Sequence, residues 1–215
     1  MTQLTIAIAK GRLQSDALDL LKSIGINVSD AGESSRRLSI EDQTGEYRFL
    51  LVKPGDVAVY VEHGVADCGI VGRDVLLETN ADVLQPLDLP IGRCRMVVAA
   101  LADAPANGHG MVKVATKYPG IATRHFGSRG QPVEIIQLSG SVELAPVLGL
   151  ADCIVDLVET GRTLRENGLA VAEEIFPSTA RLIVNRASYQ LRAESMMKLI
   201  DKMRSTVREG AEVDD

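Results

Sequence analysis

Short apolar runs alternate with amphipathic segments along most of the chain. Leu4–Ala9 is a largely apolar run typical of a buried strand, and apolar residues then recur at helical spacing until Gly25, where a helix cap belongs. The pattern predicts further strands at 47–52, 68–71, 95–101, 112–116, 133–137, 153–156 and 180–184. Helices are predicted at 56–63, 120–128, 142–148 and 162–166, and from residues 73 and 189 onward. Such alternation is typical of α/β proteins with parallel sheets.

The strands and helices fall into two groups that separate near residue 90. We therefore expect two lobes with a central cleft, lobe I formed by residues 1–90 plus 180–215 and lobe II by residues 91–179. The last strand and helix are too little for a third domain, so they are expected to return to lobe I. The acidic tail, residues 209–215, is expected to be disordered.

Composition and charge exclude several classes of protein. The chain has 215 residues, of which 46% are hydrophobic and 24% charged, as in ordinary globular proteins. A net charge of −6 argues against a general surface for nucleic acid or anionic membranes, which would repel it. No apolar run approaches the ~18 residues of a membrane span, and 4–9 is too short for a secretory leader. We expect a cytoplasmic protein with no nucleic-acid or membrane partner.

The segment 154–164 combines a buried strand, an acidic strand end and a Thr-Gly-x-Thr turn that opens a helix. Such a turn presents backbone N–H groups to an anion, and glycine lets the backbone approach it closely. The threonine hydroxyl groups and the guanidinium of Arg162 could also donate hydrogen bonds to the anion. The candidate anion-binding residues are Thr160, Gly161, Arg162 and Thr163.

Two carboxylates in this segment indicate that the ligand is more than a phosphate. Asp156 and Glu159 would repel a bare phosphate, but they suit a ligand that also carries hydroxyl groups or Mg²⁺. A phosphorylated ribose has both kinds of group. The same segment also fits an ordinary strand, turn and helix in which a threonine caps the helix.

Two basic segments lie in the N-terminal part of the chain. Lys10-Gly11-Arg12 follows the first strand and precedes the first helix, which in open α/β sheets is a position at the ligand crevice. Gly11 permits a tight turn there, and a helix N-terminus favours anions. Arg36-Arg37 is the second basic segment. Both segments fit solvent-exposed charges equally well.

Several blocks of the sequence resemble those of one enzyme family, and they occur in the family's order over essentially the whole chain. The blocks are 9–12, 35–38, 56–64, 72–75, 115–119, 140–146, 149–164 and 181–185. Together they resemble the ATP phosphoribosyltransferases, the first enzymes of histidine biosynthesis. Arg162 departs from the pattern, since the family often has an uncharged polar residue there, and Arg73 stands where lysine is usual.

The resemblance implies a fold, two substrates and a set of site residues. The fold would be two-lobed and periplasmic-binding-protein-like (type II), with lobe II carrying the turn that holds the 5-phosphate of phosphoribosyl pyrophosphate. Glu143 and Asp156 would address the ribose. The residues expected beside the polyphosphates of ATP and the departing pyrophosphate are Lys10, Gly11, Arg12, Arg36 and Arg37. Mg²⁺ would be carried by the substrate pyrophosphate, with no firm protein ligand.

The reaction implied by the resemblance requires charge stabilisation more than proton transfer. Adenine N1 of ATP attacks the anomeric carbon while pyrophosphate leaves, so fixed cations should supply much of the catalysis. Our hypothesis is that Arg12 and Arg36 are these electrostatic catalysts. We expect no catalytic histidine: His63 should end a helix, His109 lies in a polar loop, and His125 is expected on a helix surface.

The length of the chain matches the short members of the family, which lack a C-terminal regulatory domain. By resemblance, we expect a separate regulatory subunit similar to histidyl-tRNA synthetase, a homodimer of the chain alone and a hetero-octamer with the partner. Two other functions stay open at this point. One is a non-enzymatic ligand-binding protein of the same fold, and the other is a phosphoribosyltransferase that acts on a different base.

Overall fold

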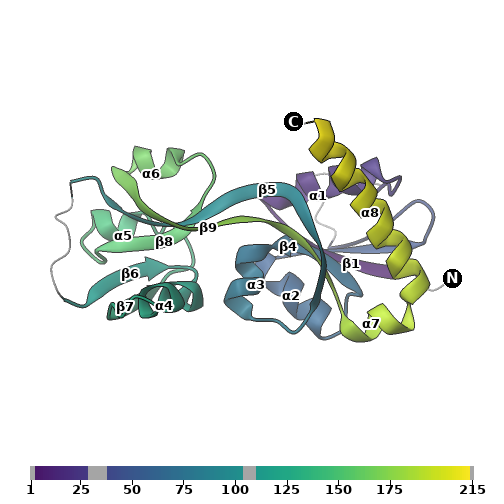
Figure 1. Cartoon of the computed structure of the whole chain (residues 1–215), viewed down its shortest axis with the longest axis horizontal. Coiled ribbons are helices and arrows are strands. Elements are labelled where there is room, and N and C mark those ends of the chain that lie inside the picture. Colours follow the sequence, from purple (N-terminus) through teal and green to yellow (C-terminus); the bar gives the residue numbers. More distant parts are fainter. Residues whose placement is uncertain (1–2, 29–37, 104–109, 214–215) are drawn as a thin grey trace. The chain divides into compact units, whose positions relative to one another are not determined.

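The computed structural model describes residues 3–28, 38–103 and 110–213. The chain divides into two compact units, Met1–Gly92 with Thr179–Asp215 (unit 1) and Arg93–Ser178 (unit 2). Two long strands, β5 (Leu84–Leu101) and β9 (Leu169–Val184), have residues in both units. In each unit, helices cover both faces of a mixed sheet (Figure 1). No helix in the described ranges is long and apolar enough to cross a membrane.

The sheet of unit 1 is centred on three parallel strands. These are β1 (Leu4–Ala9), β3 (Tyr47–Val52) and β4 (Cys68–Gly72). The short strand β2 (Ser39–Glu41) pairs antiparallel with β3, and β9 pairs antiparallel with β4. Every residue of β1 except Thr5 is buried, which explains why its sequence is largely apolar rather than alternating.

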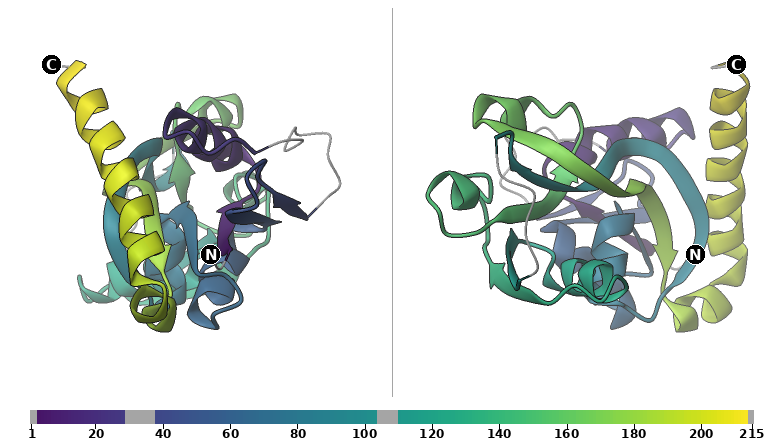
Figure 2. Two further views of the ribbon diagram at one scale, coloured as in Figure 1. Left: turned by 90° about the vertical axis from the view of Figure 1, so that its right-hand side faces the viewer. Right: turned by 60° about the vertical axis from the view of Figure 1, so that its left-hand side comes forward.

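Helices enclose the unit 1 sheet from two sides. On one face, α1 (Arg12–Ser23) and α8 (Ala193–Val213) pack into a core with β1, β3 and β9. On the other face, α2 (Pro54–Glu62) and α3 (Arg73–Thr79) form a second core. The short helix α7 (Arg186–Leu191) precedes α8, and Figure 2 shows α8 as one long helix along this unit.

Unit 2 repeats the architecture with fewer elements. Its parallel strands are β6 (Val112–Thr116), β7 (Val133–Gln137) and β8 (Cys153–Val158), and β5 pairs antiparallel with β8. Helix α4 (Pro119–Gly127) covers one face. Helices α5 (Leu144–Val147) and α6 (Arg162–Glu166) cover the other. The predicted α/β alternation is thus confirmed.

Three features differ from the prediction. β5 begins at Leu84 and β9 at Leu169, each eleven residues earlier than predicted. Prolines and acidic residues in these stretches resemble loop composition, although the two strands are neighbours in the sheet. The C-terminal helix was expected to start at Tyr189, but α7 and α8 are separate helices. The expected disordered tail was wrong as far as Val213, since α8 continues through it.

Candidate active site

In unit 2, the carboxyl ends of three parallel strands meet at one edge of the sheet. Thr116 of β6 is in register with Gln137 of β7 and with Val155 of β8. The segments that leave this edge therefore start close together, and this edge is where open α/β sheets bind ligands. They include Lys117, the segment 138–143 and the turn 159–163.

The turn after β8 has the left-handed conformation that its glycine allows. Gly161 has φ 72° and ψ 12° and is the N-cap of α6. The guanidinium of Arg165 donates from Nη1 to the carbonyl oxygen of Thr160 at 3.0 Å. A Cβ atom at position 161 would lie 3.1 Å from that nitrogen, so both the backbone angle and the neighbouring side chain favour glycine.

The polar side chains of the turn are exposed. Thr160, Arg162 and Thr163 all lie at the surface of unit 2. The hydroxyl of Thr160 accepts a long hydrogen bond, 3.4 Å, from the amide of Arg162. The Arg162 guanidinium donates from Nε to Glu166 at 2.7 Å along the surface of α6. This pair is compatible with a charge that faces water, so phosphate binding by Arg162 stays a prediction.

The two predicted ribose-side carboxylates flank the same sheet edge. Asp156 lies on β8 opposite Val97 of β5 and is half-buried. Glu143 is half-buried and directly precedes α5, two residues after Ser141, whose φ of 49° marks a sharp turn. Glu159 is exposed at the start of the turn. The three carboxylates thus lie near the sheet edge that carries the turn.

In unit 1, the parallel strands β1, β3 and β4 also end at a common edge. Ala9 is in register with Val52, and Ile8 with Ile70, so Lys10 and Lys53 follow adjacent strands. Lys10 donates its amide to Val52 O at 2.7 Å, and Gly11 turns the chain into α1 with φ 93°. Arg12 is the exposed first residue of α1, and Arg73 begins α3 after β4. The edge is basic.

Lys53 is a candidate that the sequence analysis missed. It is the N-cap of α2, directly after β3, and its side chain is exposed. A signal was present, because a strand followed by Lys53-Pro54 repeats the strand, cation and helix order of Lys10-Gly11-Arg12. Arg36 and Arg37, predicted to contribute to the same site, lie outside the described residues.

The predictions for His63 and His125, which the structure describes, differ in their outcome. His63 ends α2, as predicted. The expectation that His125 lies on a helix surface was wrong: its side chain is only 8% exposed and its Nε2 lies 3.4 Å from Glu173 of β9. The ring also packs edge-on against Phe126. The face of α4 that carries His125 turns toward β9, which the local pattern of a nine-residue helix did not reveal.

The fold is that of the periplasmic-binding-protein class. The periplasmic aliphatic sulphonate binding protein SsuA from Escherichia coli matches 99% of the chain with a TM-score of 0.64, while the sequences are 15% identical. At that identity the likeness concerns the fold alone. It confirms the predicted fold class.

The family is shown by closer relatives. The model of the family described as "HisG: ATP phosphoribosyltransferase" matches residues 53–205. An ATP phosphoribosyltransferase of Caldanaerobacter subterraneus subsp. tengcongensis is 50% identical over 98% of this chain and 100% of its own length. One from Listeria innocua is 46% identical over 97% of this chain and 98% of its own length. The chain therefore belongs to the ATP phosphoribosyltransferase family.

A solved structure of a relative agrees with this assignment. The structure described as "ATP phosphoribosyl transferase (HisG:HisZ) complex from Thermotoga maritima" has a chain that is 38% identical, with a TM-score of 0.84. The match covers 96% of this chain and 100% of that one. The resemblance inferred from the sequence is confirmed, and a ligand-binding protein, which rested on fold alone, loses its support.

Proposed function

We propose that this chain transfers the phosphoribosyl group of phosphoribosyl pyrophosphate to ATP. The lone pair of adenine N1 forms a bond to the anomeric carbon, and the bond from that carbon to the pyrophosphate oxygen breaks. Pyrophosphate leaves with the bonding electrons, and the product is N1-(5-phosphoribosyl)-ATP, the first intermediate of histidine biosynthesis. N1 carries no proton in ATP, so the step needs no general base.

The main support for the proposal is the turn at the end of β8, in a chain that belongs to the ATP phosphoribosyltransferase family. Gly161 takes the left-handed conformation that opens α6, and Thr160 and Thr163 place hydroxyl groups beside it. These groups would hold the 5-phosphate through backbone amides and hydroxyl donors. Glu143 and Asp156 would accept hydrogen bonds from the ribose hydroxyls. Units 1 and 2 would correspond to the predicted lobes I and II.

The basic edge of unit 1 would receive the polyphosphates. Lys10, Arg12 and Lys53 follow neighbouring strand ends there. Charge develops on pyrophosphate as it departs, so fixed cations stabilise the transition state more than the ground state. We assign Arg12 and Arg36 this catalytic role, with Gly11 and Arg37 completing the binding segment.

A divalent metal would accompany the pyrophosphate. Among the residues in the described ranges, no three His, Cys, Asp or Glu side chains converge as a metal site. We assign the pyrophosphate oxygens as the main ligands of Mg²⁺, because this ion commonly binds through substrate phosphates. When bound, Mg²⁺ neutralises charge on the leaving group.

We propose that the chain works with a regulatory subunit. The Thermotoga maritima relative was solved in a HisG:HisZ complex, and it matches this chain over its full length. The partner would resemble histidyl-tRNA synthetase and confer inhibition by histidine. The catalytic chain alone would form a homodimer, and with the partner a hetero-octamer. As a step of amino-acid biosynthesis from ATP, the reaction would take place in the cytoplasm.

The experiment is a direct assay of the reaction. The protein is mixed with phosphoribosyl pyrophosphate, MgCl₂ and ATP, with and without the regulatory subunit, and the ultraviolet absorbance of an N1-substituted adenine nucleotide is followed. We expect product with ATP and more of it with the partner. Pyrophosphate release with hypoxanthine or orotate but not with ATP would assign the chain to another base and reject the proposal.

A further inference from the structure

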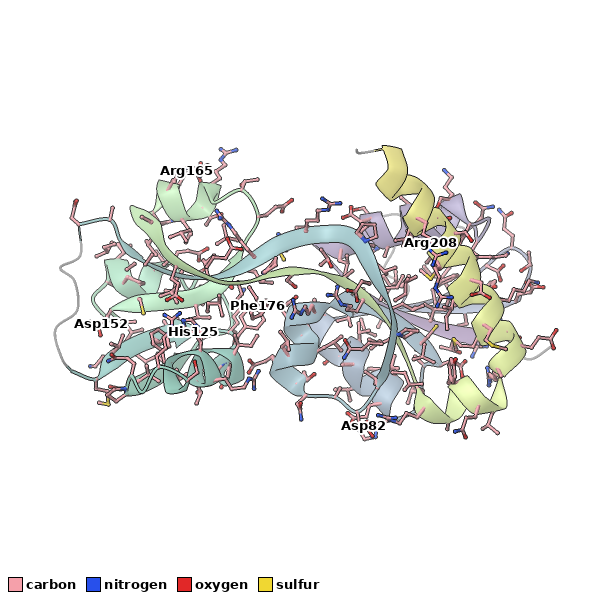
Figure 3. The ribbon with its side chains drawn as sticks, viewed as in Figure 1. Asp82, His125, Asp152, Arg165, Phe176 and Arg208 are labelled. Carbon is pink, nitrogen blue, oxygen red and sulfur yellow. The ribbon has the colours of Figure 1, made fainter. Side chains whose placement is uncertain are left out.

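Arg165 contacts the backbone of the turn that opens α6. The residue lies in the last turn of this helix (Figure 3), and its Nη1 donates to the carbonyl oxygen of Thr160 at 3.0 Å. Its backbone amide also donates to Gly161 O at 3.2 Å, the first hydrogen bond of the helix. The side chain is solvent-exposed, so burial in the core does not explain its position.

The hydrogen bond to Thr160 determines where the next amide points. A trans peptide is planar, and its C=O and N–H groups point in opposite directions. Holding the oxygen of Thr160 toward Arg165 therefore directs the N–H of Gly161 away from Arg165. Glycine occupies both halves of the φ range readily, so this peptide could rotate to other orientations without an added constraint.

Because residue 161 is a glycine, the guanidinium of Arg165 can lie close to the turn. A Cβ atom there would be 3.1 Å from Arg165 Nη1 and 3.7 Å from Val158 Cγ1. Arg162 does not provide the same constraint, because its guanidinium is directed to Glu166. Arg165 is thus a side chain that holds the Thr160 carbonyl in place.

We propose that Arg165 is a positioning residue, which holds the Thr160–Gly161 peptide so that the Gly161 amide is presented to the 5-phosphate of phosphoribosyl pyrophosphate. This rests on the proposed function of the turn. If only a fraction of the molecules hold the Thr160–Gly161 peptide in the orientation that binds phosphate, the apparent affinity for phosphoribosyl pyrophosphate falls in proportion to that fraction. The 5-phosphate does not change in the reaction, so the loss should appear in KM for this substrate rather than in kcat.

The test compares Arg165→Ala and Arg165→Lys with the wild-type protein. Amide hydrogen–deuterium exchange over residues 159–165 is measured on the free protein, and steady-state kinetics are measured with the regulatory subunit. For Arg165→Ala we expect faster exchange, a KM for phosphoribosyl pyrophosphate raised about ten-fold, and kcat within about two-fold. The lysine variant should lie between the two, because its ammonium can still reach the carbonyl. Lys113→Ala, an exposed cation of the same unit, is the control and should match wild type.

The exchange measurement separates this proposal from its alternatives. Unchanged exchange in free Arg165→Ala would overturn the positioning role, including the case in which Arg165 contacts phosphate directly and only KM rises. A parallel loss of kcat or a higher KM for ATP would also overturn it. If phosphoribosyl pyrophosphate fails to protect 159–165 in the wild-type protein, the proposed function of the turn fails instead, and the positioning role falls with it.

Discussion

At the scale of single residues, the most specific catalytic hypothesis concerns Arg12, at the basic edge of unit 1. Arg12 is exposed at the start of α1, where the helix dipole already favours an anion. Its guanidinium can bind pyrophosphate through two hydrogen bonds, which a lysine cannot do. The same residue could instead contribute only to ground-state binding of ATP. Kinetics of one variant distinguish these roles.

Arg12→Ala should lower kcat about 100-fold if its contact with the departing pyrophosphate contributes ~3 kcal/mol to the transition state. The measurement is the initial rate at saturating ATP and phosphoribosyl pyrophosphate. Arg48→Ala is the matched control, since Arg48 is an exposed arginine of unit 1 paired with Glu41. An unchanged kcat with a higher KM for ATP would remove Arg12 from catalysis and leave it a binding residue.

A candidate residue could be predicted from the sequence where a local pattern of strand, turn and helix surrounds it. Thr160, Gly161 and Thr163 fall at the turn that their pattern predicted. Lys53 was missed although its local pattern resembles that of Lys10, because only the register of β3 with β1 shows that the two lysines follow adjacent strands. Arg165 was missed for a related reason: its role is a contact with a backbone carbonyl five residues earlier.

At the scale of elements, a buried carboxylate joins four parts of unit 1. Asp67, which precedes β4, accepts hydrogen bonds from the Thr5 amide of β1 at 2.8 Å and from the Ser188 hydroxyl of α7 at 2.7 Å. It also accepts one from Arg192 Nη1, between α7 and α8, at 2.9 Å. The Asp67 side chain is 8% exposed, so these partners replace its hydration.

Asp67→Ala should destabilise the protein by about 3 kcal/mol, because it leaves buried donors unsatisfied and removes the partner of Arg192. Urea unfolding followed by circular dichroism measures this. Asp201→Ala is the control, since Asp201 forms an exposed pair with Arg204 on α8 and should change stability by less than about 0.5 kcal/mol. Equal effects of the two substitutions would show that the network contributes no more than a surface ion pair.

A second link between elements joins α4 to β9 in unit 2. Arg129, just after α4, forms two hydrogen bonds with Glu173 of β9. The hydrogen bond from Arg129 holds the pKa of Glu173 below its usual value of 4.5, partial burial opposes this, and the charge of His125 adds to the lowering. A carboxylate with a lowered pKa in the folded state stabilises the protein above pH 4.5, and this stabilisation disappears as the pH falls through the folded pKa.

Arg129→Ala should therefore lower Tm slightly at neutral pH, and the difference from wild type should shrink as the pH falls below 4.5. The effect is small because Arg129 is exposed to solvent. Arg129→Lys should keep part of it, since the charge stays while the paired hydrogen bonds are lost. A Tm difference that is constant from neutral to acidic pH would contradict this assignment.

Elements with strong local periodicity were predictable, whereas those defined by distant pairing were not. The strands β1, β6 and β7 appear at the predicted residues, because each is a short run dominated by apolar and β-branched residues. The first half of β9 contains Glu173 and Glu174 and was not recognised, since its faces are partly exposed and β5 supplies the pairing. Helix α8 extends through an acidic segment because charge alone does not prevent a helix of good formers.

At the scale of the whole molecule, the net charge bears on how anionic substrates bind. The chain carries a net charge of −6, and both proposed substrates are polyanions. The basic residues at the strand ends of unit 1 must therefore create a local field opposite in sign to the average. A metal bound to the pyrophosphate, as proposed above, would reduce the charge that this field has to balance.

Binding of phosphoribosyl pyrophosphate should consequently depend on Mg²⁺, whereas binding of ribose 5-phosphate should not. A ligand that binds only the folded state at 100 times its Kd stabilises it by about 2.7 kcal/mol. We expect a Tm increase of this origin for phosphoribosyl pyrophosphate with MgCl₂, and a much smaller one with EDTA at the same ionic strength, which keeps screening constant. Ribose 5-phosphate lacks the pyrophosphate and needs only the turn after β8, so its Tm increase should be equal in both buffers. If phosphoribosyl pyrophosphate stabilises the protein equally in EDTA, the cations of the chain alone balance the pyrophosphate and the metal has no role in binding.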